Sequence, residues 1–294
     1  MFRLAFCYSC LLLSLFGGTA SIPAAPEEKV KLYPLAVNTA KDEDEPHVSA
    51  DGLTLIFTGH PKEGKDDLLI ATRKMLSAPW GKAQVLQDYI QTKGDDRSAF
   101  VTTGAFPRYL FYATTKDKTQ KNFDLYVAVQ QDRGRAWSAP TPVMNVNTKE
   151  DELHPWLSGD GKTLYFSRKT AEGWKQMKTT RNASKGPGGW SEPQEVGLPT
   201  GFHHLTLMPD GKTGYVQGVT DKGRDGIFVV TRQGKGWSQP TLLSQLEDDT
   251  SKRGNRSPNL SRDGKYLYFA SDRDGGKGGL DLYYVPTASI ALKK

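Results

Sequence analysis

The side chains of this 294-residue chain that are best suited to chemistry occupy equivalent positions in a unit that recurs five times. One position holds Asp44, Arg97, Leu153, His203 and Arg256, and the next holds Glu45, Ser98, His154, His204 and Ser257. Groups from different copies would meet wherever the copies converge. We therefore predict one ligand-binding site that comprises Asp44, Glu45, His47, Arg97, His154, Trp156, His203, His204, Arg256 and Asn259.

Hydrolysis of a glycosidic bond is one reaction that such residues could catalyse, because it needs a carboxylic acid and a carboxylate on either side of the bond. Asp44, Glu45, Asp151 and Glu152 could supply these groups. They come from only two copies of the unit, however, and no feature of the sequence marks one of them as a proton donor. A serine nucleophile would need a Gly-x-Ser-x-Gly turn, which the chain lacks. We predict no catalytic residue, and we favour a binding protein over an enzyme.

The histidines raise the alternative of a metal site. Imidazole and carboxylate groups from different copies are suitable metal ligands, and four of the five histidines could lie near one another: His47, His154, His203 and His204. The competing explanation is that these groups form hydrogen bonds between neighbouring copies, as buried polar groups must. We favour this explanation and predict neither a metal nor a cofactor.

The elements that position these residues are clearest in residues 256–285. Apolar side chains alternate before and after the tight turn Asp263-Gly264, and a glycine-rich loop separates the second run, Tyr266 to Ala270, from a third, Leu282 to Val285. Alternation with a period of two between such turns predicts consecutive antiparallel strands. Three strands cannot bury a face by themselves, so the unit must pack against further copies.

The chain repeats this unit with a period of about 53 residues. The turn aspartates Asp51, Asp160, Asp210 and Asp263 are separated by 109 residues for two repeats, then by 50 and 53. That period is typical of a four-stranded propeller blade. Tryptophans 80, 137, 190 and 237 each introduce a segment that could form the fourth strand. The sequence therefore predicts an all-β, five-bladed β-propeller of four-stranded antiparallel blades, which we favour over a β-sandwich or barrel.

The fifth copy lacks a fourth strand of its own, because the chain ends soon after its third. Residues 33–39 closely resemble residues 142–148, which precede the third copy, although no blade precedes residues 33–39. We expect the N-terminal segment to pair with residues 282–285 and to close the ring, since closure removes an exposed sheet edge.

The N-terminal 20 residues have the pattern of a secretory signal peptide. Arg3 precedes an apolar segment, Leu4 to Phe16, that is too short to span a membrane and is followed by small residues. Both cysteines, Cys7 and Cys10, lie in it. We expect an exported protein, periplasmic or extracellular, with the propeller in residues 30–287 and a tail in residues 288–294.

The rest of the chain narrows the range of partners. Its 39 Lys and Arg against 33 Asp and Glu give a formal charge of +6, and the basic residues are dispersed rather than clustered. Nucleic-acid binding needs a clustered basic surface, so we predict none. No later apolar run is long enough for a membrane span. We expect a monomer whose ligand is an unknown protein, peptide or glycan.

Residues 257–265, 267–273 and 275–283 resemble the WD-repeat-like β-propeller repeats of bacterial exported proteins, of the kind found in TolB-type propellers. The resemblance extends over about residues 30 to 287. It implies a propeller that acts as a binding or scaffold module at the mouth of its central channel. The alternative is a secreted carbohydrate-active enzyme with a five-bladed propeller fold.

Overall fold

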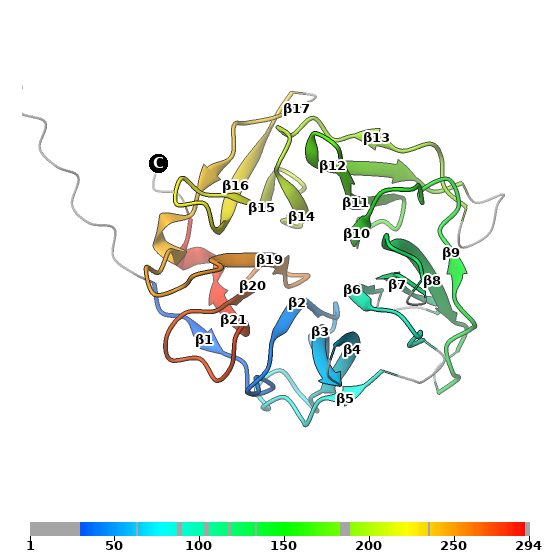
Figure 1. Cartoon of the computed structure of the whole chain (residues 1–294), viewed down its shortest axis with the longest axis horizontal. Helices are drawn as coiled ribbons and strands as arrows, with labels where there is room; N and C mark the ends of the chain where they lie inside the picture. Colours follow the sequence, from blue (N-terminus) through cyan, green and yellow to red (C-terminus); the bar gives the residue numbers. More distant parts are fainter. Residues whose placement is uncertain are drawn as a thin grey trace, which may run out of the picture.

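The computed structural model describes residues 30–62, 64–86, 90–102, 106–116, 119–132, 134–182, 189–234 and 236–291. Five antiparallel sheets are arranged as blades around a central axis, which confirms the predicted five-bladed propeller (Figure 1). The inner strands β2, β6, β10, β14 and β19 surround the axis, and the short fourth strands lie at the periphery. The predicted signal peptide, residues 1–20, lies outside the described residues.

The first three blades are built alike. Blade 1 contains β2 (Glu43–Val48), β3 (Thr54–Lys62), β4 (Lys65–Thr72) and β5 (Gln84–Val85). Blade 2 contains β6 (Asp96–Val101), β7 (Arg108–Thr114), β8 (Asp124–Gln130) and β9 (Thr141–Pro142). Blade 3 contains β10 (Glu152–Leu157), β11 (Thr163–Thr170), β12 (Gly173–Thr180) and β13 (Gln194–Glu195).

The last two blades vary this plan. Blade 4 contains β14 (His203–Leu207), β15 (Thr213–Val219) and β16 (Asp225–Gln233), which pairs with both β17 (Gly236–Trp237) and β18 (Thr241–Leu242). Blade 5 contains β19 (Asn255–Leu260), β20 (Tyr266–Ser271), β21 (Asp281–Pro286) and the N-terminal β1 (Tyr33–Pro34). Two short 3-10 helices, η2 (Ser244–Leu246) and η3 (Thr287–Ser289), complete the described elements.

The tryptophan segments lie a few residues before the fourth strand in three blades. β5, β9 and β13 begin after Trp80, Trp137 and Trp190, whereas Trp237 lies in β17 itself. In every case the residue after the tryptophan donates a backbone hydrogen bond to the end of the third strand. The tryptophans thus begin the outer pairing, and three of them are buried between blades: Trp80, Trp190 and Trp237.

The N-terminal segment closes the ring as predicted. β1 pairs with β21, with Tyr33 opposite Tyr284 and Pro34 opposite Tyr283, and the two strands lie side by side in Figure 1. Leu35 N–H donates to Leu282 O at 2.9 Å. One continuous sheet therefore contains residues from both ends of the described chain.

An amide side chain reinforces this closure and recurs in two other blades. Asn38 donates to Leu282 O at 3.0 Å and accepts from Leu282 N–H at 2.9 Å. Gln91 makes the same pair of bonds with Leu68, and Asn147 makes it with Leu125. The similarity of residues 33–39 to residues 142–148 thus reflects a shared task, in which an amide clamps the third strand of the preceding blade.

Apolar residues fill the space between neighbouring blades. Five buried clusters lie at the five interfaces, one between each pair of adjacent sheets. Phe57, Phe111, Phe166 and Phe269 are fully buried on the second strands of four blades. Each such side chain contributes about 1.5–3 kcal/mol when it is removed from water. The blades therefore hold one another in place and leave the inner strands to carry polar groups.

Every inner strand contains a bulge at the same position. Glu45, Ser98, His154, His204 and Ser257 all have φ between 53° and 57°, in the left-handed region, and the register of the first strand pair shifts there in each blade. Non-glycine residues in this region are uncommon and cost of order 1 kcal/mol each. The repeated bulge collects these five side chains around one end of the channel.

The apolar core includes residues near the C-terminus. Ile290, which follows η3, is 1% exposed and packs in the cluster between blades 4 and 5. Among the described residues, no helix has the length and apolar character that a membrane crossing would require.

Candidate functional site

The ten predicted site residues divide between the two ends of the channel. We call the end where the inner strands begin the carboxylate mouth, and the end with the tight turns after the inner strands the hairpin mouth. Seven residues gather at the carboxylate mouth: Asp44, Glu45, Arg97, His154, His203, His204 and Arg256. His47, Trp156 and Asn259 lie toward the hairpin mouth. The ten residues therefore form two groups at opposite ends of the channel rather than one.

Glu45 connects three blades at the carboxylate mouth. Its carboxylate accepts hydrogen bonds from the Thr58 hydroxyl at 2.6 Å and from the Ser98 N–H and hydroxyl at 2.9 and 2.7 Å. Arg97 Nε and His154 Nε2 each lie 3.3 Å from it. Burial opposes the charge, but Arg97, His154 and the hydroxyl donors hold the pKa of Glu45 well below its usual range. With its oxygens fully engaged, Glu45 is a structural anion.

Asp44 lies between two arginines. Arg256 Nε is 3.2 Å from Asp44 Oδ2, and Arg97 Nη2 is 3.5 Å from the same oxygen. The other oxygen, Oδ1, accepts the Ser257 hydroxyl at 2.6 Å. Although Oδ2 is buried, it completes no hydrogen bond with any described residue. Asp44 Oδ2 therefore interacts with the described residues through its ion pairs with the two arginines alone.

Two further carboxylates extend this group into a charge network of Asp66, Arg97, Asp44, Arg256 and Asp225. Arg97 Nε lies 3.4 Å from Asp66 Oδ2, and Arg256 Nη1 lies 3.6 Å from Asp225 Oδ2. Asp66 and Asp225 hold equivalent positions near the starts of the third strands of blades 1 and 4. Their side chains are 16% and 23% exposed, so both face the carboxylate mouth from its rim.

Asp225 binds its proton more strongly than an ordinary aspartate does. Burial raises the pKa of Asp225, and the negative charge of Asp44 adds to this shift, while Arg256 opposes it. Burial also raises the pKa of Asp66, while its neighbours Arg97 and His60 oppose this shift. The carboxylate mouth thus combines an anion at its floor with carboxyl groups at its rim that bind protons more strongly.

Sequence reasoning missed Asp66 and Asp225 because it considered only the inner strands. The loops between the second and third strands differ in length from blade to blade, so the third strands are not in register along the sequence. A signal was present: Asp66 directly precedes Asp67, which recurs as Asp124 and Asp281 before a leucine. Residues just before that recurring aspartate reach the rim of the mouth.

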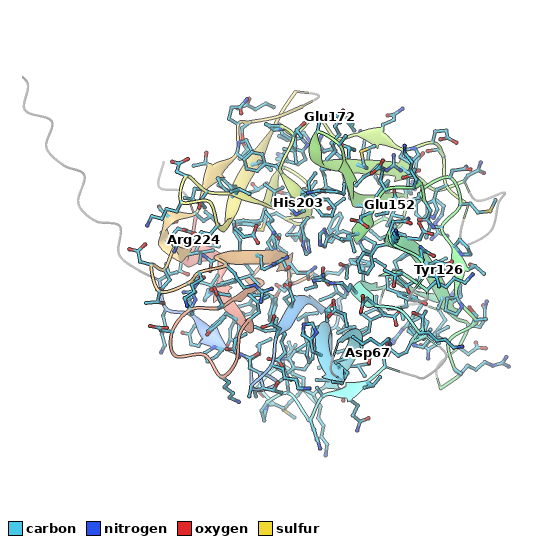
Figure 2. All side chains as sticks on the ribbon, in the orientation of Figure 1. Asp67, Tyr126, Glu152, Glu172, His203 and Arg224 are labelled. Carbon is cyan, nitrogen blue, oxygen red and sulfur yellow. The ribbon has the colours of Figure 1, made fainter. Side chains whose placement is uncertain are left out.

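Aromatic rings form the side of the carboxylate mouth opposite Asp66. Trp174 stacks on His203 with ring centroids 4.7 Å apart, and His154 stacks on His204 at 3.9 Å. His154 Nδ1 lies 3.0 Å from Ser167 Oγ. Burial and the neighbouring His154 keep the pKa values of His203 and His204 well below the usual range, so both are neutral. Figure 2 shows His203 beside the central axis, whereas Tyr126 and Glu172 lie further out.

The other two carboxylates considered for catalysis belong to the scaffold. Glu152 is fully buried and accepts from the Thr148 N–H and hydroxyl and from Arg168 Nε at 2.7 Å. Glu43 likewise accepts from the N–H and hydroxyl of Thr39, and Asp96 accepts from the N–H and hydroxyl of Thr92. Asp151 accepts from the Phe123 N–H. These residues fix the loops that lead into the inner strands, and they do not reach the mouth.

At the other end of the inner strands, His47, Phe100, Trp156, Thr206 and Asn259 occupy equivalent positions, one from each blade. His47 Nε2 donates to Val101 O at 3.1 Å, which fixes a neutral tautomer with Nδ1 unprotonated. A cavity of about 980 Å³ opens from this ring toward the hairpin mouth. No group of three or more His, Asp, Glu or Cys side chains in the described chain is arranged to hold a metal ion.

Acid should destabilise the fold through His47. Burial lowers the pKa of His47 from 6.5 to about 4, so between these values the unfolded chain takes up a proton that the folded protein does not bind. The free energy of unfolding should therefore fall as the pH drops from 6.5 to 4, by about 3 kcal/mol for this residue. Urea denaturation of the wild type and His47→Gln at both pH values measures the difference. Identical pH dependence in the two proteins would contradict this assignment.

Comparisons with known proteins identify glycosidases with this fold. No family model matches the sequence, and no curated protein is similar to it. Among solved structures, the arabinanase of Bacillus subtilis is similar with a TM-score of 0.61 and 11% identity, covering 87% of this chain and 97% of that one. An endo-arabinase of Bacteroides thetaiotaomicron is similar with a TM-score of 0.61 and 12% identity, covering 91% of this chain and 99% of that one. The α-L-arabinofuranosidase of Podospora anserina is similar with a TM-score of 0.57 and 14% identity, covering 88% of this chain and 96% of that one.

These neighbours correct the predicted family and what depended on it. The assignment to TolB-type WD-repeat-like propellers was wrong, because the similar structures are glycosidase propellers. The binding-scaffold function followed from that family, whereas the preference for a non-enzyme rested on the lack of a marked proton donor; the glycosidase neighbours contradict both. The error has a physical origin: alternating strands and tight Asp-Gly turns are demanded by any four-stranded blade, so they identify the architecture but not the family.

Proposed function

We propose that this protein hydrolyses glycosidic bonds at the carboxylate mouth. The observation that carries the proposal is the position of Asp44 and Asp225 on either side of one guanidinium group, that of Arg256. The two carboxyl groups therefore lie close to each other, and glycosidases place their two carboxyl groups about 5–10 Å apart. The five-bladed glycosidases with a similar fold support the same class of reaction.

Each of these residues has a distinct role in the proposed reaction. Asp225 donates its proton to the glycosidic oxygen as the bond between that oxygen and the anomeric carbon breaks. A water molecule attacks the anomeric carbon and gives a proton to Asp44 Oδ2, the oxygen that completes no hydrogen bond with a described residue. Arg256 positions both carboxylates. Asp44 then releases its proton to solvent and Asp225 regains one, which returns both carboxyl groups to their starting states.

The environment of the two carboxylates supports this division of roles. Asp225 is a rim residue whose pKa is raised by burial, which favours a protonated carboxyl group. Asp44 lies deeper, next to two guanidinium groups that stabilise a negative charge. The stacked rings of Trp174 and His203 provide an apolar wall beside them, of the kind that packs against the faces of sugar rings.

The substrates to examine first are those of the structural neighbours. The similar solved structures include arabinanases and arabinofuranosidases, and one is a complex with xylotriose. We propose arabinofuranosyl linkages in arabinan or substituted xylan as the substrate class. We further propose that the protein acts outside the cytoplasm, which agrees with the signal-peptide pattern of residues 1–20.

Release of reducing sugar from arabinan, arabinoxylan and 4-nitrophenyl α-L-arabinofuranoside tests this function. Purified wild-type protein should hydrolyse at least one of them, and Asp44→Asn should abolish the reaction while retaining the wild-type circular dichroism spectrum. Hydrolysis that persists in Asp44→Asn would show that the reaction occurs elsewhere. If folded wild-type protein releases no sugar from any of the three, the proposed function is wrong.

A further inference from the structure

The cavity at the hairpin mouth has no part in the proposed hydrolysis. Its volume of about 980 Å³ is at the upper end of the range for small-molecule sites, about 300–1,000 Å³. Blades 2, 3 and 4 contribute aromatic and basic side chains to its lining: Phe100, Tyr109, Trp156, Tyr165, Arg181 and Arg232. The channel separates them from the charge network, which begins at the opposite ends of the inner strands.

Aromatic side chains form the wall of this cavity. Phe100 and Trp156 are the two half-buried members of their ring of five, whereas His47, Thr206 and Asn259 are buried. Trp156 meets Phe100 at 66° and Tyr165 at 62°, so neighbouring rings face different directions around the wall. Such a wall offers several apolar faces to a ligand whose rings have apolar faces of their own, and it leaves part of each aromatic surface uncovered.

The arginines of the cavity lack the acidic partners that arginines have at the other mouth. Arg97 and Arg256 each contact at least two carboxylates. No described carboxylate forms an ion pair with Arg181, Arg232 or Arg262, and Arg181 Nε is buried without a hydrogen-bond partner among the described residues. These guanidinium groups are charged at any physiological pH. The cavity lining therefore combines three guanidinium groups that pair with no described carboxylate and two carboxylates, Asp160 and Asp210, that bind elsewhere.

Aromatic rings hold two of these arginines, Arg181 and Arg232, in place. The Arg181 guanidinium lies over Tyr109 at 4.7 Å from the ring centroid, and that of Arg232 lies over Trp237 at 4.2 Å. Arg73 forms the equivalent pair with Trp80 in blade 1, but its Nε donates to Gly52 O at 2.7 Å. Stacking on an aromatic ring is therefore a repeated feature of the blades, whereas the absence of a partner for Nε distinguishes Arg181 from Arg73.

Hydrogen-bond acceptors complete the lining. Asp160 and Asp210 cap their turns with Oδ1, which accepts from the N–H groups of Lys162 and Lys212. Their side chains border the cavity, as does His47, whose buried Nδ1 has no hydrogen-bond partner among the described residues. Carboxylate oxygens and an unprotonated imidazole nitrogen accept hydrogen bonds from hydroxyl groups. Apolar faces, acceptors and unpaired cations are thus combined in one cavity.

We propose that the hairpin-mouth cavity is a second binding site, which takes an oligosaccharide that carries a carboxylate, such as a uronic-acid residue. Sugar rings pack on Phe100 and Trp156, hydroxyl groups donate to Asp160 and Asp210, and the carboxylate pairs with Arg181 and Arg232. This site goes beyond the proposed hydrolysis, because it uses none of the residues of the charge network.

Calorimetric titration with two xylo-oligosaccharides of equal length, one bearing glucuronic acid and one neutral, tests this site. The protein carries Asp225→Asn, so that neither ligand is consumed and the outcome is independent of the hydrolytic activity. The acidic ligand should bind at least about tenfold more tightly than the neutral one, because only it can form charge-assisted hydrogen bonds with the arginines. Its affinity should fall as salt is raised.

Arginine variants then locate the bound ligand. Arg181→Gln and Arg232→Gln should each weaken binding of the acidic ligand about tenfold, and Arg73→Gln should leave it unchanged, because that arginine lies in another blade interface. Melting curves confirm that each variant is folded. Equal affinity for the two ligands, no binding of either, or an equal loss in Arg73→Gln would overturn the proposal.

Discussion

Replacing Asp225 with asparagine should slow hydrolysis of an arabino-oligosaccharide by about 10²- to 10⁴-fold, the usual contribution of a general acid. An amide cannot donate the proton that the leaving sugar oxygen needs. An aryl glycoside with a good leaving group depends little on that proton, so its cleavage by Asp225→Asn should remain close to the wild-type rate. The ratio of the two rates, measured on both substrates, distinguishes loss of a proton donor from general damage.

Asp66 provides the matched comparison for this experiment. It holds the position of Asp225 in blade 1 and contacts an arginine in the same way, but it also binds His60 at 2.7 Å. Asp66→Asn should therefore lower both rates by similar factors, if at all. Asp66→Asn could instead slow hydrolysis of the arabino-oligosaccharide alone, while Asp225→Asn does not. That result would transfer the role of proton donor to Asp66.

The pH profile of the same reaction gives an independent check. Asp225 acts as an acid only while protonated, so activity should fall as the pH rises through its pKa, which burial raises above the usual range. Arg256 opposes that rise. Arg256→Gln should therefore move the alkaline limb of the profile to higher pH, whatever its effect on the maximal rate. A shift toward lower pH would contradict the assignment of that limb to Asp225.

Deleting residues 30–40 should leave the protein unfolded or aggregated. The deletion removes β1, the buried side chains of Leu35 and Val37, and the amide of Asn38. Together these contribute on the order of 5–10 kcal/mol, from apolar burial and from backbone groups of Leu282 that would lose their partners. That is comparable with the whole stability of a typical domain, about 5–15 kcal/mol. Thermal melting followed by circular dichroism measures the loss.

A point variant separates the closure from the loss of chain length. Asn38→Ala keeps every residue of the N-terminal segment but removes both side-chain hydrogen bonds to Leu282. It should lower the free energy of unfolding by about 1–3 kcal/mol, because the buried N–H of Leu282 is left unpaired while Leu282 O keeps the Leu35 N–H. A melting curve of the deletion variant that matches the wild type would show that the N-terminal strand does not close the ring.

Much of the fold follows from local patterns. Alternation in residues 266–270, the tight turn at Asp263-Gly264 and the repeat of both at about 53 residues are enough to predict blades. Even the closure was predictable, because residues 33–39 repeat a segment that follows a blade. These features depend on backbone geometry and on neighbours close in sequence, which impose similar residues on every copy.

The sequence by itself thus determined the architecture and the inner-strand positions that carry polar groups. Tertiary structure decided how those groups are used. Glu45 became a structural anion because Ser98 and His154, from two other blades, engage it, while Asp225 acquired a raised pKa from burial and from Asp44. The charge of a carboxylate and the apolar surface of a cavity depend on groups that only the closed ring brings together. The strength of the interactions between these groups depends on distance and burial, which no spacing along the chain reveals.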